Sequence, residues 1–191
     1  SMTGQINTEL KKPLTSERMF FNLFRSLEGR NEFNFHTKTT LSSKLSTNLF
    51  MHFNQISEKI DKNKDGFLDL PLSEQVNILS RFQYLDTEKG WVSFFNIRFL
   101  QDDKIFGQGE FSPKLHKNTT SIWGSEIMTY RYESSLKIGY VFPDLPYQSF
   151  GMQLTYSDHS QDSYYGLRTY DINHKSGFGN LLFNSILGNT L

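Results

Sequence analysis

The chain has 191 residues, and its 20 basic and 20 acidic residues balance, so its charge points to neither nucleic acid nor an anionic surface as a partner. Cysteine is absent, which excludes disulfides and thiolate metal sites. No apolar run reaches 18 residues, so the sequence predicts no transmembrane helix. The 18 phenylalanines and 9 tyrosines are more than a soluble core needs on strand-like segments.

Alternation of apolar and polar residues, with turn signals between, predicts about eight strands and almost no helix. The predicted strands cover roughly 18–26, 31–41, 45–55, 74–85, 91–100, 128–142, 148–157 and 177–187. The connections alternate between short and long, and the long ones are 56–73, 101–124 and 158–176. This alternation is typical of outer-membrane barrels, whose periplasmic turns are tight and whose extracellular loops are long.

The sixth predicted strand, from Met128 to Phe142, carries the clearest signal. One face of it is apolar or aromatic except at Ser134. The other face carries Thr129, Arg131, Glu133, Ser135, Lys137 and Gly139. Its length exceeds the roughly 9–11 residues that a strand needs to cross a bilayer, and an apolar outside with a charged inside suits a membrane barrel. A long strand of a soluble antiparallel sheet is the alternative interpretation.

The long connection at 56–73 contains the first part of an EF-hand-type calcium loop, in which oxygen ligands alternate around a glycine. The candidate ligands are the side chains of Asp61, Asn63, Asp65 and Asp69 and the carbonyl of Phe67. Position 12 is Leu72, so the bidentate acid is missing and the motif is not an EF-hand. The loop either binds calcium or is stiffened by Asx turns alone.

The sequence shows no catalytic motif, so we do not expect an enzyme. The five histidines share no metal-like spacing and are interpreted as lumen or loop residues: His36, His52, His116, His159 and His174. The predicted loop at 158–176 mixes aromatic and polar residues, as binding surfaces do. Its candidate substrate-binding residues are Tyr164, Tyr165, Arg168 and Tyr170, and ordinary loop residues over a barrel mouth are the alternative.

Three segments carry a resemblance to one known family. The run GQINTELKKP, Gly4 to Pro13, resembles the last strand of the plug domain of TonB-dependent outer-membrane receptors. The run DKNKDGFLDLPLSEQ, Asp61 to Gln75, is similar to the extracellular loop between barrel strands three and four in one branch. The run FFNLF, Phe20 to Phe24, with the turn at 28–30 and then Asn34 and His52, fits the same branch, which is nearest to the cobalamin and metal-chelate receptors.

The resemblance implies an all-β fold: an antiparallel up-and-down transmembrane β-barrel segment with about eight strands of a plugged barrel of about 22. Residues 1–13 would be the last plug strand and linker, and 14–191 the first part of the barrel. The implied function is active uptake of a scarce chelate, namely cobalamin, siderophore iron or haem, across the outer membrane of a Gram-negative cell. The implied partners are outer-membrane lipid, the rest of the barrel and plug, the TonB complex, the chelate and a surface lipoprotein. The charge balance predicts no nucleic-acid partner, and calcium at the 61–69 loop is the one candidate cofactor.

Two alternatives from other classes remain open. One is a self-contained eight-stranded outer-membrane barrel with a structural or adhesion role, since eight strands are enough to close. The other is a soluble, calcium-dependent β-sandwich that binds carbohydrate.

Overall fold

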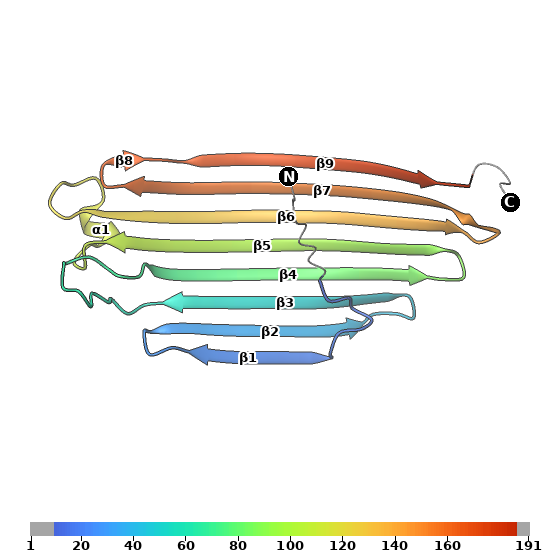
Figure 1. Ribbon diagram of the computed structural model, residues 1–191, viewed down its shortest axis with the longest axis horizontal. Coiled ribbons are helices and arrows are strands. Elements are labelled where there is room, and N and C mark those ends of the chain that lie inside the picture. The colour runs from blue at the N-terminus through green and yellow to red at the C-terminus, as the bar shows by residue number, and fades with distance from the viewer. Residues whose placement is uncertain (1–9, 187–191) are drawn as a thin grey trace, which may run out of the picture.

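One single-layered antiparallel sheet makes up nearly all of the structure (Figure 1). The computed structural model describes residues 10–186. Its elements in chain order are β1 (Met19–Arg25), β2 (Arg30–Thr40), β3 (Leu45–Ile56), β4 (Leu72–Asp86), β5 (Trp91–Gly107), α1 (Pro113–His116), β6 (Gly124–Phe142), β7 (Leu145–Tyr165), β8 (Arg168–Thr169) and β9 (Ile172–Asn184). In this part of the chain no helix has both the length and the apolar character to cross a membrane.

Each strand pairs with the next one along the chain, so the sheet runs up and down, and β8 and β9 both pair with β7. Within residues 10–186, β1 pairs only with β2 and β9 only with β7. The predicted all-β, up-and-down architecture is therefore confirmed, and the sheet is open. The open edges contradict a closed eight-stranded barrel, and the single layer contradicts a two-sheet sandwich.

The first four strands lie within two residues of the predicted ranges, whereas β5 and β7 are longer than predicted. The long loop predicted at 158–176 is wrong, because β7 continues to Tyr165 and β9 begins at Ile172. These extensions carry polar residues on both faces, so the apolar alternation ends while the backbone ladder continues. In β5, for example, Gln101 Nε2 lies 2.7 Å from Asp103 Oδ2 on one face, and Lys104 Nζ lies 2.7 Å from Asp102 Oδ2 on the other.

The tight turns and the long loops lie at opposite ends of the sheet (Figure 1). The turns at 41–44, 87–90 and 143–144 share one end, and the long loops at 57–71 and 108–123 share the other with the shorter connections at 26–29 and 166–171. Gly90 closes its turn with φ 73°, and its carbonyl accepts a hydrogen bond from Val141 N at 2.9 Å. A Cβ on Gly90 would lie 1.9 Å from Val141 O, so this turn requires glycine.

The sheet has two chemically different faces. The inner face is the one against which residues 10–17 lie, and the outer face is the opposite one. Side chains alternate between them along each strand. The chain exposes 13467 Å², whereas a compact soluble protein of 22.3 kDa exposes roughly 9,400 Å². Among residues 10–186 only Phe111 and Tyr164 are buried hydrophobic residues, so the sheet has no apolar core of its own.

Candidate functional site

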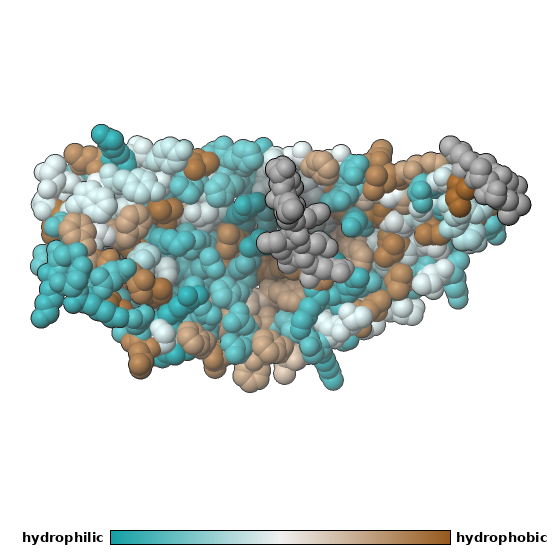
Figure 2. Space-filling view, viewed as in Figure 1, coloured by the Kyte–Doolittle hydropathy of each residue, from teal (hydrophilic) through white to brown (hydrophobic). Residues whose placement is uncertain are grey.

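The inner face lines an open cavity of about 930 Å³, whose wall contains both apolar and polar side chains (Figure 2). Its polar lining comes mostly from side chains of β2 to β7 and β9 that share one face by alternation and register. This polar lining includes Asn34, His52, Asn77, Arg98, Arg131 and Glu133. Alternation along the strands places all of them on one face, and the sequence had pointed to four of them: Asn34, His52, Arg131 and Glu133.

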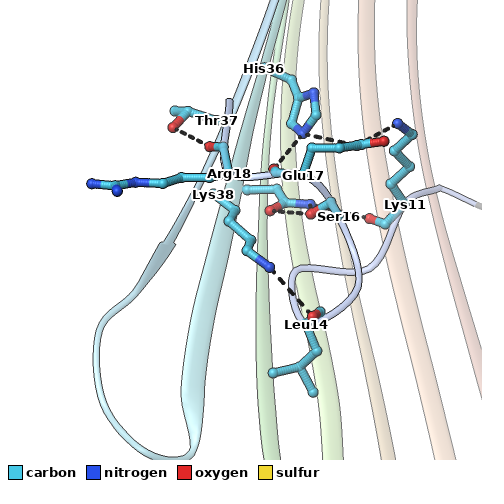
Figure 3. Close-up of polar contacts among 9 residues, drawn as sticks. Lys11, Leu14, Ser16, Glu17, Arg18, His36, Thr37 and Lys38 are labelled. Atoms are coloured by element: carbon cyan, nitrogen blue, oxygen red, sulfur yellow. Dashed lines mark hydrogen bonds and ion pairs between the residues drawn. The ribbon is translucent and has the colours of Figure 1, made fainter. Parts of the chain in front are cut away.

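Residues 10–17 lie across the inner face and are held mainly through their backbone carbonyls (Figure 3). The side chain of Arg81 donates to Leu10 O at 3.5 Å, that of Asn48 to Lys11 O at 3.4 Å, and that of Lys38 to Leu14 O at 3.5 Å. These donors come from three neighbouring strands. The wall therefore recognises this segment mostly by its backbone.

Asn48 is the central contact of the segment, because it is completely buried. Its amide nitrogen donates to Ser16 Oγ at 2.9 Å. On the next strand, His36 Nε2 lies 3.1 Å from Glu17 O. The predicted plug strand at 1–13 falls mostly on residues 1–9, which lie outside the described residues, and residues 10–13 contain no strand.

A charged network lies at the centre of the cavity, on β5 and β6. Arg98 Nη1 lies 3.1 Å from Glu133 Oε2, and Arg131 Nη2 lies 2.6 Å from Glu133 Oε1. Arg98 Nε also donates to Asn77 Oδ1 at 3.0 Å. One carboxylate thus serves two guanidinium groups, and the network keeps one net positive charge.

The loops at the long-loop end interlock into one layer. Lys59 Nζ donates to Gly109 O at 2.6 Å, and the rings of Phe67 and Trp123 make a tilted contact with centroids 6.2 Å apart. Gly166 N donates to Gly124 O at 2.9 Å, which ties the connection after β7 to the start of β6. The loop layer therefore closes this end of the sheet from β3 to β9.

The turn at 26–29 joins the same layer through an ion pair between Glu28 and Lys62. The hydrogen bond from Lys62, followed by its charge, lowers the pKa of Glu28. The same bond and the charge of Glu28 raise the pKa of Lys62. Both side chains are half-exposed, so solvent screens the pair and it orients the loops more than it stabilises them.

The structure does not bring the four candidate binding residues onto one surface. Tyr164 is 2% exposed and packs against Phe111 of loop 108–123, with Lys117 Nζ 4.8 Å from its ring centroid. Tyr165 points to the other face, where its ring centroid lies 6.1 Å from that of Phe106. The remaining two lie on β8 and just after it and are exposed: Arg168 and Tyr170.

Burial, followed by the negative charge of Glu126, raises the pKa of Tyr164 to about 12. Tyr164 and Phe111 thus form a small core that fastens loop 108–123 to the end of the sheet. Tyr164 is a packing residue, and the binding-surface prediction stays a prediction for the three exposed residues, which are Tyr165, Arg168 and Tyr170.

In the candidate calcium loop, carboxylate oxygens accept hydrogen bonds from nearby backbone amides. Asp61 accepts from Gly66 N at 2.9 Å and from Asp65 N at 3.2 Å, and Asp65 accepts from Phe67 N at 2.8 Å. Asp69 accepts from Lys62 N at 2.8 Å. This is the geometry of Asx-type turns. Within residues 10–186 no group of three or more His, Cys, Asp or Glu residues is placed to hold a metal, and calcium binding stays a prediction.

The outer face carries an apolar band whose members lie in register across the strands. One row crosses β5, β6, β7 and β9 as Trp91, Tyr140, Phe150 and Phe183. A second row, nearer the loop layer, crosses β2 to β6 as Phe35, Met51, Ile78, Phe99 and Tyr132. Between these two rows, no outer position from β2 to β9 carries a charge.

A row of polar and charged residues borders the band on the loop side of β1 to β5: Arg25, Asn31, Gln55, Glu74 and Asp103. Farther along the sheet the border continues as Asp158 on β7 and Lys175 on β9, whose charged atoms lie 3.1 Å apart. At the turn end, Asp86 on β4 ends the band. The outer face is therefore an apolar belt with a polar border.

No family model, no curated protein and no solved structure matches the chain.

Proposed function

We propose that this chain forms part of the wall of a TonB-dependent outer-membrane receptor that takes up a scarce chelate, namely cobalamin, siderophore iron or haem. The observation that carries the proposal is the apolar belt on the outer face, opposite an inner face that buries polar side chains. Soluble proteins rarely expose an apolar patch larger than a few hundred Å², and larger patches mark an interface or a membrane.

The height of the belt fits a bilayer. On β4 the bordering carboxylates, Glu74 and Asp86, are twelve residues apart. At about 3.3 Å per residue this is about 40 Å along the strand, or about 30 Å along the membrane normal for a tilt of about 40°. Because the apolar band of such barrels is about 25 Å tall, both carboxylates would lie just outside the hydrocarbon.

The open edges require further strands in the same wall. In lipid each unpaired backbone group costs several kcal/mol, and within residues 10–186 the outer edges of β1 and β9 pair with no strand. A barrel of about 22 strands would supply the missing neighbours. In this arrangement the loop layer faces the outside of the cell, the tight turns face the periplasm, and the inner face lines the lumen.

Two parts of the proposal are supported only by the sequence resemblance. They are the partners, namely the plug, the TonB complex and a surface lipoprotein, and the identity of the substrate as a chelate. The sequence of the complete reading frame directly tests whether the protein belongs to this class of receptor. We expect a plug upstream and about fourteen further strands downstream, with the product in the outer-membrane fraction. A product that stays monomeric in water without detergent would contradict the proposal.

A further inference from the structure

The inner face carries a net positive charge, although the whole chain is neutral. Its positions on β2 to β6 hold seven cations and three anions by alternation and register. The cations are Arg30, Lys38, Arg81, Arg98, Lys104, Arg131 and Lys137, and the anions are Glu32, Asp102 and Glu133. The field in the cavity therefore favours an acidic occupant.

The strongest cationic feature is the pair formed by Arg98 and Arg131. Both side chains line the cavity, and 38% and 42% of their surfaces stay exposed. Glu133 gives one oxygen to each guanidinium and neutralises only one of the two charges. The Glu133 carboxylate is also an example of the chemical group to which these two guanidinium groups donate.

The network also contains unmet hydrogen-bonding capacity. Arg131 Nε is buried and has no acceptor among the described residues. His159, its cross-strand neighbour on β7, likewise has a buried Nδ1 without a partner in this part of the chain. A buried polar atom left unpaired is costly, so a further acceptor beside Arg131 is favoured.

We propose that Arg98 and Arg131 bind a carboxylate of a molecule that occupies this cavity. The planar guanidinium fork matches a carboxylate in a bidentate geometry, and a volume of about 930 Å³ lies within the range of ligand pockets. The carboxylate comes from a free small molecule or from an acidic side chain of a polypeptide on the inner face. Glu133 acts as an internal competitor. The proposal depends on the inner face and not on membrane insertion, so it can fail or hold independently of the proposed function.

Isothermal titration of the protein expressed from the complete reading frame, in detergent, tests the site with two probes. The first is glutarate, and the second is an acetylated Gly-Glu repeat peptide amide, with the matching Gly-Gln peptide as its control. Arg131→Gln and Arg98→Gln should each weaken binding at least tenfold, because each removes a charge-assisted pair. Arg25→Gln, on the outer face, is the matched control and should change nothing.

Glu133→Gln gives the sharpest result, since it removes the competitor and should tighten binding of the carboxylate probe. If the network only held β5 and β6 together, Glu133→Gln would instead weaken binding of the carboxylate probe. Glutarate binding identifies a free carboxylate as sufficient, and binding of the Gly-Glu peptide alone identifies a polypeptide source. Binding of neither probe, or equal binding in Arg131→Gln and Arg25→Gln, would overturn the proposal. If a glutamine variant loses its strand signal in circular dichroism, Arg131→Lys keeps the charge and removes only the fork, and it should still weaken binding.

Discussion

Leu136→Arg is the substitution that the two-faced sheet penalises most clearly. Leu136 lies on the outer face of β6, in register with Phe95 on β5 and Leu154 on β7. It is four residues from Tyr140 in the turn-side aromatic row and four from Tyr132 in the loop-side row. The new guanidinium would therefore enter the apolar belt at mid-height. An arginine at the bilayer midplane costs about 2–4 kcal/mol, which lowers the ratio of folded to unfolded protein about 30- to 900-fold.

Lys137→Leu is the matched control, because it changes the next residue on the opposite face. Lys137 is exposed and lies in register with Phe94 and Gln153 on the inner face. A leucine there removes a charge without burying one. We expect a change in stability within about 0.5 kcal/mol, as for most exposed positions.

The assay measures assembled protein in the outer membrane, expressed from the complete reading frame, together with its urea midpoint in lipid vesicles. Leu136→Arg should lower both strongly, and Lys137→Leu should leave both near the unchanged protein. Equal damage by the two substitutions would refute the assignment of faces. An undamaged Leu136→Arg protein would show that the outer face does not contact lipid.

Four further predictions test individual contacts. Asn48→Ala should cost about 1–3 kcal/mol and expose the backbone near Lys11 to proteolysis, because it removes the buried bonds to residues 10–17; an unchanged cleavage pattern would contradict this. Gly90→Ala should destabilise by about 1–3 kcal/mol more than Gly66→Ala in urea unfolding, because both have positive φ but only Gly90 meets Val141 O. Burial raises the pKa of Tyr164 from 10.0 to about 12 in the folded protein, so its contribution is complete below pH 10 and is lost as the pH rises toward 12; the Tyr164→Phe protein should lack this loss in alkaline unfolding. Calorimetry with and without a chelator tests the calcium prediction: Asp65→Ala should abolish any calcium heat, and a heat that survives it would exclude Asp65 as a ligand.

The sequence could predict which segments form strands and which side chains lie on each face of the sheet. It could do so because the apolar belt requires apolar and polar residues to alternate along each strand. On β6, residues from Tyr130 to Ile138 alternate between apolar and polar except at Ser134, and the structure places the two sets on opposite faces. The position of the turn at Gly90 could also be predicted, because a glycine there separates two runs of alternating apolar and polar residues. These signals are local, and each depends on only a few neighbouring residues.

The ends of β5 and β7 could not be predicted from alternation. Beyond the belt both faces are polar, so Asp102 and Asp158 read as loop residues although the backbone ladder continues through them. The burial of Tyr164 depends on Phe111, which is 53 residues away and belongs to another loop. The contact of Arg98 and Arg131 with one glutamate depends on the register between β5 and β6, which no single segment contains.

The central claim is that neighbouring residues of one strand face lipid and water, and Ser134 and Ser135 test it most directly. They are adjacent on β6, Ser134 on the outer face and Ser135 on the inner face, where its Oγ accepts a hydrogen bond from Asn96 at 2.9 Å. The chain has no cysteine, so Ser134→Cys and Ser135→Cys each introduce the only thiol in it, with little change in size. In the assembled membrane protein, a charged water-soluble thiol reagent should label the Ser135→Cys protein, and a lipophilic maleimide should label the Ser134→Cys protein. Equal labelling of both by the charged reagent would contradict the account.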